Sequence, residues 1–250
     1  MAQAEAPRLI AHRFGRAYGP DSSRQALSRA IEAPIVGVET DCCLTKDGKV
    51  VLLHELLLGK ATTLSGWAWE RTAEEICAAE LLTQAGEASG QHPLLLEEGL
   101  DLLSGRDLVK QLEIKAYADD RLALATVEAV LGLLATEKAW REGTEIVSFW
   151  PDPCRCAAER GFPARPIVAC AYAPEAMAQW AREASIAGVI LEGAYFSERP
   201  VRVWRQAGLS VMSGVVNTAS ELRRVLPFSP DMIATDRPAE LLDEIGGDAH

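Results

Sequence analysis

Four short segments in the first 115 residues place charged side chains at the ends of predicted strands. They are His12-Arg13, Glu39-Thr40-Asp41, His54-Glu55 and Glu113-Ile114-Lys115. Together they supply two imidazoles, several carboxylates and two cations. This set contains enough ligands and counter-charges to hold a divalent metal ion and a phosphate group.

Strand parity groups the acidic side chains. Residues i and i+2 of a strand point to the same face, so Glu39 projects with Asp41, and Glu113 projects with Lys115. Two carboxylates from one strand and a third from another strand form an oxygen-only site of the kind that Mg²⁺ or Ca²⁺ prefers. Glu39, Asp41 and Glu113 are therefore the candidate metal ligands.

The histidines and the basic residues have complementary candidate roles. His12 and His54 each follow an apolar strand. Either one alone is also compatible with a hydrogen-bonded structural histidine. Two imidazoles beside one metal site, however, suit acid–base catalysis, in which one accepts a proton and the other donates one. Arg13 and Lys115 are the candidates for binding phosphate oxygens.

The composition is that of a globular protein with a large core. The chain has 250 residues, 48% of them hydrophobic, and a formal net charge of −11. Such an acidic chain repels nucleic acid, so we expect a small-molecule partner. No run approaches the roughly 18 apolar residues of a membrane span. The spacing of the six cysteines fits neither a disulfide framework nor a zinc site, so we expect free thiols and a cytoplasmic location.

Apolar, β-branched runs alternate with amphipathic stretches along the chain. The predicted strands are Arg8–His12, Val36–Asp41, Val109–Lys115, Glu145–Phe149, Pro166–Ala171, Ala187–Leu191, Leu209–Val215 and Met232–Thr235. The predicted helices are Ser23–Glu32, Asp120–Lys138, Pro174–Ala184, Val201–Ala207 and Ala219–Val225. Eight such units predict an α/β fold, a (β/α)8 TIM barrel with its active site at the carboxyl ends of the strands. An open doubly wound sheet is less compatible, because no glycine-rich loop follows the first strand.

One segment interrupts the alternation. Asp47-Gly48 is a strong hairpin signal between two extended runs. A two-residue turn there would place Asp41 directly opposite His54. No comparable strand follows before residue 107. We therefore expect a single domain over residues 1–250, with a small insertion at about 55–107 after the second strand and its hairpin.

These motifs, in this order, resemble the glycerophosphodiester phosphodiesterase family. The similarity extends over nearly the whole chain, and the ordered set is more specific than any single motif. The matching segments are Leu9-Ile10-Ala11-His12-Arg13, Val38-Glu39-Thr40-Asp41, Leu44-Thr45-Lys46-Asp47-Gly48, Val51-Leu52-Leu53-His54, Leu112-Glu113-Ile114-Lys115, Ser148-Phe149, Val216-Asn217 and Ile233-Ala234-Thr235-Asp236-Arg237-Pro238.

The resemblance implies a TIM barrel that hydrolyses glycerophosphodiesters to glycerol 3-phosphate and an alcohol with a divalent metal. It implies the roles already considered for the charged residues. Glu39, Asp41 and Glu113 would bind Mg²⁺ or Ca²⁺, His12 and His54 would be the acid–base pair, and Arg13 and Lys115 would bind phosphate. Ser148, Trp150 and Asn217 are candidates for the substrate pocket, although Ser148 and Asn217 fit equally well as caps of loops or helices.

Four positions depart from the family pattern. Ser22 stands in a segment that usually reads Pro-Glu-Asn-Thr, Glu55 replaces an aspartate, Trp150 replaces an aspartate, and Gly214 replaces a tryptophan. We expect from these changes that the alcohol or glycerol part of the substrate differs from that of common glycerophosphodiesters. Two alternatives are a related phosphodiesterase that acts on a lipid or forms a cyclic phosphate, and an inactive barrel that binds a phosphorylated metabolite.

Overall fold

Eight parallel strands close into a ring in the computed structural model, which describes residues 7–115, 119–169 and 173–247. The ring strands are β1 (Leu9–Ala11), β2 (Gly37–Leu44), β4 (Val109–Ile114), β5 (Thr144–Ser148), β6 (Ala164–Val168), β7 (Gly188–Leu191), β8 (Ser210–Ser213) and β9 (Ile233–Thr235). Since β1 pairs with both β2 and β9, the sheet has no free edge within the ring. The predicted TIM barrel is confirmed, and β3 (Val50–Leu52) lies outside the ring, antiparallel to β2.

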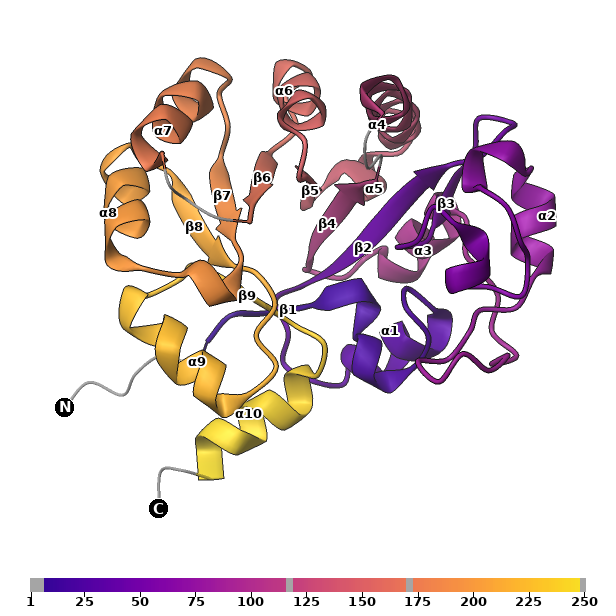
Figure 1. Cartoon of the computed structure of the whole chain (residues 1–250), viewed down its shortest axis with the longest axis horizontal. Helices are drawn as coiled ribbons and strands as arrows, with labels where there is room; N and C mark the ends of the chain where they lie inside the picture. Colours follow the sequence, from indigo (N-terminus) through magenta and orange to yellow (C-terminus); the bar gives the residue numbers. More distant parts are fainter. Residues whose placement is uncertain (1–6, 116–118, 170–172, 248–250) are drawn as a thin grey trace.

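The helices cover the outside of the barrel (Figure 1). They are α1 (Arg24–Ala30), α2 (Ala73–Ala78), α3 (Leu96–Leu103), α4 (Asp120–Leu134), α5 (Lys138–Arg141), α6 (Pro151–Glu159), α7 (Pro174–Glu183), α8 (Glu198–Gln206), α9 (Ala219–Val225) and α10 (Pro238–Gly247). All five predicted helices are present. The predicted set did not include α2, α3, α5, α6 or α10. In α6 the first turn holds two prolines, which favour a helix start but obscure the apolar periodicity. In the described parts of the chain, no helix is long and apolar enough to cross a membrane.

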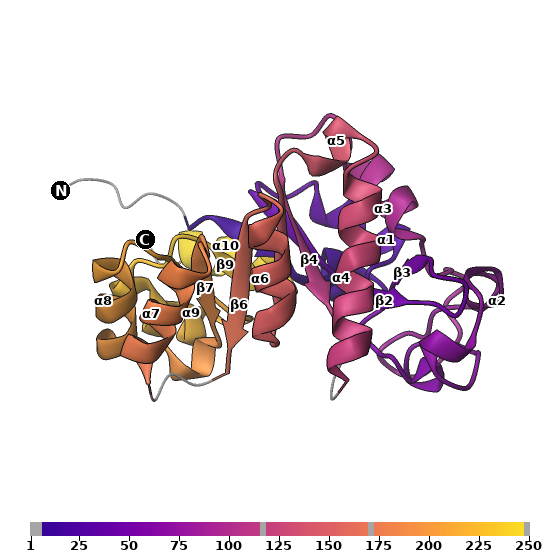
Figure 2. The ribbon, with the colours of Figure 1, turned by 90° about the horizontal axis from the view of Figure 1, so that it is seen from above.

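Buried apolar residues form three clusters. The largest fills the space between the outer surface of the barrel and the helices. A second occupies the interior of the barrel, with Ile10, Val147, Ile190, Met212 and Ala234 among its members. The third lies between the β3 hairpin and the insertion that follows it. Figure 2 shows this insertion displaced to the side of the barrel, at the end toward which the β6 arrow points.

The hairpin register differs by one residue from the prediction. Cys42 pairs with Leu52 and Leu44 with Val50, so the partner of Asp41 in this register is Leu53 rather than His54. The backbone N–H of Leu53 indeed donates to the carbonyl of Asp41 at 3.0 Å. The loop therefore contains three residues instead of two.

The side chain of Thr45 explains the longer loop. Its hydroxyl oxygen accepts a hydrogen bond from the backbone N–H of Lys49 at 3.0 Å, which closes the turn at Thr45, one residue earlier on the first strand than a two-residue turn would. Gly48 has a φ of +75°, the left-handed conformation that the third residue of such a loop requires. His54 consequently lies just after the paired part of the hairpin, two residues beyond the end of β3, and its side chain lines the cavity at the barrel mouth.

A buried ion pair lies in the barrel interior. Arg165 donates to both carboxylate oxygens of Glu145, at 2.8 and 2.9 Å, and Gln111 donates to the same carboxylate at 3.0 Å. Arg165 also donates to the hydroxyl of Ser210. These bonds join β4, β5, β6 and β8 through side chains as well as through their backbone ladders.

We predict that Arg165→Met lowers the free energy of unfolding by about 3–5 kcal/mol at pH 7, because it leaves a buried carboxylate without its cation. Burial acts to raise the pKa of Glu145. The bonds and charge of Arg165, together with the bond from Gln111, outweigh this effect and hold the pKa below its ordinary value. The pair therefore stabilises the fold above the unfolded-state pKa of about 4.3, and this contribution is lost as the pH falls through the folded-state pKa. The difference between variant and wild type should shrink below about pH 4.

Urea unfolding at pH 7 and at about pH 3 measures both effects. Arg155→Met is the matched control, because Arg155 pairs with Asp152 and Glu159 on the exposed surface of α6. It should change stability little. Equal losses in the two variants would contradict a special contribution from the buried pair.

Candidate active site

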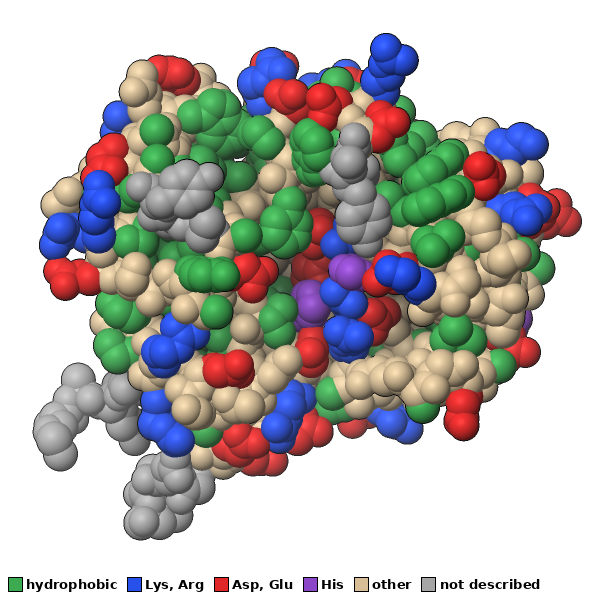
Figure 3. All heavy atoms as spheres, in the orientation of Figure 1, with side chains coloured by type: hydrophobic (Ala, Val, Ile, Leu, Met, Phe, Trp, Pro, Cys, Tyr) green, Lys and Arg blue, Asp and Glu red, His purple; other side chains and the backbone are tan. Residues whose placement is uncertain are grey.

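A cavity of about 170 Å³ opens at the carboxyl ends of the barrel strands. Its walls include six of the seven charged residues singled out from the sequence: His12, Arg13, Glu39, His54, Glu113 and Lys115. The seventh, Asp41, is fully buried and contacts Lys115. Figure 3 shows histidine, acidic and basic side chains gathered in a central hollow on this face of the molecule.

The three predicted carboxylates converge. Asp41 and Glu113 are register partners on β2 and β4, and Glu39 lies two residues before Asp41 on the same face. One oxygen from each of the three side chains lies within 4.8 Å of the other two. Glu39 Oε1 and Asp41 Oδ2 are buried and have no hydrogen-bond partner among the described residues. Such a set of unpaired hard oxygens fits a divalent cation.

Two cations face these acids. Lys115 Nζ lies 2.5 Å from Glu113 Oε1 and 3.1 Å from Asp41 Oδ1. The guanidinium of Arg13 lies 3.7 Å from Asp41 and donates to Asp21 at 2.7 Å. Lys115 therefore pairs with two of the three acids, whereas Arg13 pairs with Asp41 and with Asp21 in the loop that follows β1.

The pKa values show that the acids are short of positive charge. Burial raises the pKa of Glu39 well above its ordinary value, and the Asp41 and Glu113 carboxylates raise it further. Burial, followed by repulsion from Asp41, raises the pKa of Glu113 to about 7. Burial also acts to raise the pKa of Asp41, but the charge of Lys115, with further help from other neighbours, holds it below the ordinary value. A bound divalent cation would relieve this repulsion.

The backbone after β1 is strained where it meets the acids. Arg13 and Phe14 have φ values of +48° and +62°, which place non-glycine residues in the left-handed region. This conformation turns the backbone N–H of Arg13 toward Glu39, where it donates to Oε2 at 2.9 Å. The strained turn therefore orients one of the candidate ligands.

His12 is held by a chain of hydrogen bonds. Its Nδ1 lies 2.6 Å from Asp236 Oδ1, and Asn217 donates to the other oxygen of Asp236 at 2.7 Å. Burial raises the pKa of Asp236, but the bond and charge of His12, together with Asn217 and Arg16, hold it below the ordinary value, so Asp236 is a carboxylate and Nδ1 of His12 carries the proton. His12 Nε2 then faces the acids, 3.8 Å from Glu39 Oε2.

His54 reaches the same cavity from the end of the hairpin. Its Nδ1 lies 3.2 Å from Glu55 Oε1. Burial lowers the pKa of His54, and the charges of Lys115 and Arg13 lower it further against the opposing effect of Asp41. Both histidines therefore have one ring nitrogen next to a carboxylate, and both line the cavity.

The three predicted pocket residues have other contacts, and none of them is among the described residues that line this cavity. Ser148 donates to the carbonyl of Ile114 and accepts from the backbone N–H of Trp150, which closes a local turn before α6. Asn217 bonds Asp236 and lines a neighbouring hollow. Their contact with substrate remains a prediction.

Phe149, Glu192 and Gly214 line the cavity instead. They follow the interior residues Val147, Ile190 and Met212 by two positions, as His12 follows Ile10 and Asp236 follows Ala234. Because i and i+2 share a face, strand parity applied to every strand finds these residues from the sequence. The same rule assigns Trp150 to the opposite face.

Two of the departures from the family pattern have direct structural consequences. Gly214 leaves space for Glu192, because a Cβ at position 214 would lie only 3.0 Å from the Glu192 Cα. Ser22 is buried beneath the loop after β1, where its hydroxyl accepts from Thr40 at 2.8 Å and its backbone N–H donates to the Arg13 carbonyl. The change at Gly214 therefore alters the cavity wall, whereas Ser22 supports the strained turn.

Comparison with known proteins agrees with the fold and gives the family. The model of the glycerophosphoryl diester phosphodiesterase family matches residues 12–240. A glycerophosphodiester phosphodiesterase of Caldanaerobacter subterraneus is 25% identical over 238 residues, which cover 94% of this chain and 96% of the relative.

Two solved structures share the barrel. An Oleispira antarctica phosphodiesterase, solved with its product sn-glycerol-3-phosphate, has a TM-score of 0.86 at 21% identity, covering 96% of this chain and 97% of the other. A Thermotoga maritima glycerophosphodiester phosphodiesterase has a TM-score of 0.77 at 21% identity, covering 99% and 100%. The family resemblance predicted from the sequence is confirmed by the family match. The chain belongs to the glycerophosphoryl diester phosphodiesterase family, whose members are phosphoric diester hydrolases.

Proposed function

We propose that this protein hydrolyses glycerophosphodiesters to glycerol 3-phosphate and an alcohol, with a divalent metal ion held by Glu39, Asp41 and Glu113. The observation that carries the proposal is the convergence of three buried carboxylates and two histidines at the mouth of a barrel of this family. The product-bound relative supports glycerol 3-phosphate as the product class.

The metal ion, Mg²⁺ or Ca²⁺, would supply electrostatic stabilisation of the charge that develops on the phosphoryl oxygens. The donor set contains only carboxylate oxygens, which suits either ion. Lys115, whose pKa is raised by Asp41 and Glu113 despite burial, remains protonated and can attract the phosphate. Arg13 would assist from the side of the β1 loop.

The histidines would move the protons. Water attacks phosphorus, the bond to the leaving oxygen breaks, and one proton must be removed from the nucleophile while another is delivered to the leaving alcohol. His12 and His54 line the same cavity and would share these two tasks. Asp236 would keep His12 Nε2 directed into the cavity, because it binds Nδ1 on the opposite side of the ring, and Asn217 would hold Asp236 in place.

A cyclising phosphodiesterase and an inactive phosphometabolite binder remain the competing functions. The acid–base pair favours catalysis over binding, because a binding site has little use for two opposed histidines. In the cyclising reaction a hydroxyl of the substrate replaces water as the nucleophile, and the same residues would serve it.

Phosphorus NMR of the products decides among the three. Purified protein with Mg²⁺ or Ca²⁺ should convert glycerophosphoethanolamine to glycerol 3-phosphate, and a chelator should stop the reaction reversibly. A cyclic phosphate as the final product would identify the cyclising enzyme, and inactivity with every metal and diester would favour the binder. Turnover of both glycerophosphocholine and glycerophosphoethanolamine at about 10 s⁻¹ would contradict our expectation that the alcohol or glycerol part of the substrate is unusual.

We predict that Glu113→Gln weakens metal binding at least about tenfold. Loss of a residue that only orients a metal ligand typically costs that much, and Glu113 would itself be a ligand. Isothermal titration with Mg²⁺ and Ca²⁺ measures the change. Glu74→Gln, on the exposed surface of α2, is the control and should titrate like the wild type. An unchanged titration of the Glu113 variant would remove this residue from the metal site.

We predict that His12→Ala and His54→Ala each lower kcat by about 10²- to 10⁴-fold, the usual contribution of a general acid or base. Steady-state kinetics at saturating metal measures the loss. His92→Ala is the matched control, since His92 is exposed in the insertion and bonds only a backbone carbonyl among the contacts described. Near-normal turnover of either active-site variant would exclude that histidine from the proton transfers.

A further inference from the structure

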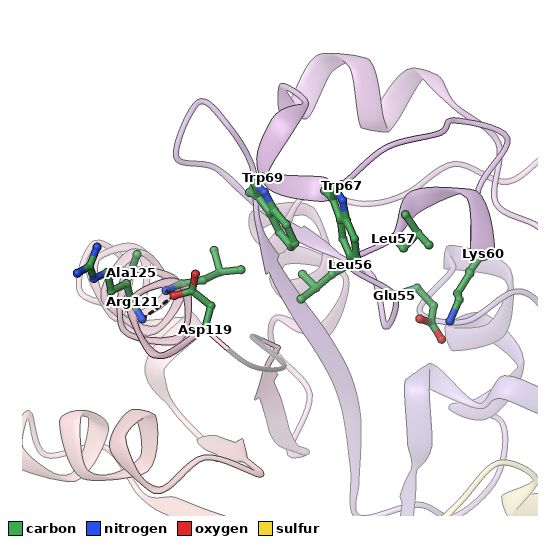
Figure 4. A pocket seen from close by; sticks show the side chains of 10 residues that line it. Glu55, Leu56, Leu57, Lys60, Trp67, Trp69, Asp119, Arg121 and Ala125 are labelled. Atoms are coloured by element: carbon green, nitrogen blue, oxygen red, sulfur yellow. Dashed lines mark hydrogen bonds between the residues drawn. The ribbon is translucent and has the colours of Figure 1, made fainter.

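A second, larger cavity of about 840 Å³ lies beside the active site, between the insertion and the first turns of α4 (Figure 4). We call it the tryptophan groove. Trp67, Trp69, Leu56 and Leu57 form its wall on the insertion, and Leu122 and Ala125 form its wall on α4. Glu55, Lys60, Asp119 and Arg121 complete its lining.

The two tryptophans are held on the surface by the fold. Their rings stack with centroids 4.7 Å apart and an angle of 15° between planes. Ala68, between them, is fully buried, and its backbone N–H donates to the Leu56 carbonyl at 2.9 Å. Trp67 and Trp69 therefore both project away from the insertion core and remain 39% and 36% exposed. Large aromatic rings fixed in such positions are typical of binding surfaces.

A smaller cavity lies between the groove and the catalytic cavity and shares lining residues with each. The groove shares Glu55 and Lys60 with this cavity of about 190 Å³, which is also lined by Arg13 and His54. Arg13 and His54 in turn line the catalytic cavity. A substrate bound at the acidic cluster can therefore extend past His54 and Glu55 into the tryptophan groove.

The volumes indicate which part of a substrate goes where. The catalytic cavity of about 170 Å³ has room for a phosphate and a small polyol, but not for a second large substituent. The groove, at about 840 Å³, is of the size that holds a small organic ligand. A larger group on the other side of the phosphorus atom has to leave the barrel mouth, and the groove lies on its route.

The lining favours an apolar group over a quaternary ammonium head group. Both acids near the tryptophans already have partners. Asp119 accepts hydrogen bonds from the backbone N–H groups of Arg121 and Leu122, and Glu55 lies beside His54. Leu56 and Leu57 lie near the indole rings (Figure 4), and Leu122 and Ala125 add aliphatic side chains to the lining from α4. We propose that the tryptophan groove binds an apolar leaving alcohol, so that the preferred substrate is a glycerophosphodiester whose alcohol carries a hydrocarbon chain.

This inference rests on the proposed function, and a matched series of substrates tests it. Glycerophosphoethanol, glycerophosphobutanol and glycerophospho-octanol all release glycerol 3-phosphate, so one assay follows them all. We expect kcat/KM to rise by about three- to fourfold for each methylene that the groove buries. Equal values along the series would overturn the inference.

Variants assign the preference to the groove. Trp69→Ala should flatten the chain-length dependence and leave hydrolysis of glycerophosphoethanol unchanged, and Trp69→Phe should restore part of the dependence. Leu226→Ala is the control, since Leu226 has a similar exposure of 37% and follows α9 outside the groove. A preference for octanol that survives in Trp69→Ala would show that the chain binds elsewhere. A preference for glycerophosphocholine that Trp69→Ala abolishes would assign the groove to a quaternary ammonium group instead.

A binding measurement separates failure of this inference from failure of the proposed function. If none of the esters is hydrolysed, the proposed function is wrong, and titration of the wild-type protein with octyl phosphate and methyl phosphate in the presence of Mg²⁺ still tests the groove. Octyl phosphate should bind at least about tenfold more tightly than methyl phosphate, and Trp69→Ala should remove the difference. Equal binding of the two phosphates would overturn the inference.

Discussion

Repulsion among three buried carboxylates is the constraint around which the active end of this barrel is organised. Glu39, Asp41 and Glu113 place an oxygen each within 4.8 Å of the others. Carboxylates so close and so buried cannot all stay ionised without positive charge, and the raised pKa values of Glu39 and Glu113 express this. Lys115 offsets part of the repulsion, and a divalent cation would offset the rest.

Closed parallel pairing is what brings these groups together. The pairing of β2 with β4 places Asp41 next to Glu113, and closure of β1 against β9 brings His12 to Asp236. Within the barrel, the Glu145–Arg165 pair adds side-chain bonds between β5 and β6. The positions of the strands set the geometry at the barrel mouth. The turn at Arg13 is strained, and its N–H donates to Glu39. Such strain persists when the surrounding structure compensates for its cost.

The hairpin and the insertion extend the site beyond the barrel. The strand β3 directs the chain so that His54 reaches the cavity, and the residues that follow it form one wall of the tryptophan groove. The candidate proton-transfer residue and the candidate specificity surface therefore lie on one continuous segment. The other wall of the groove is formed by α4, the helix that comes after β4 in the chain. Catalysis and substrate selection can thus be coupled through short stretches of chain.

Much of this arrangement was determined by the sequence alone. Alternation of strands and helices predicted the barrel, and parity within β2 and β4 predicted which acids share a face, because both follow from local backbone geometry. Consistent use of parity would also have selected Phe149 over Trp150, and would have found Glu192. The predicted free thiols agree with the five cysteines that the structure describes, whereas Cys170 lies outside the described residues.

Only the tertiary structure decided the remaining contacts. The hairpin register was mispredicted by one residue, since it depends on a side-chain bond from Thr45 that the Asp-Gly signal does not reveal. The partnership of His12 with Asp236 joins residues 224 positions apart. The tryptophan groove requires the insertion and α4 to face each other across a gap. Local preferences determine elements and faces, but contacts between distant segments depend on how the ring closes and how its loops pack, which no short stretch of sequence encodes.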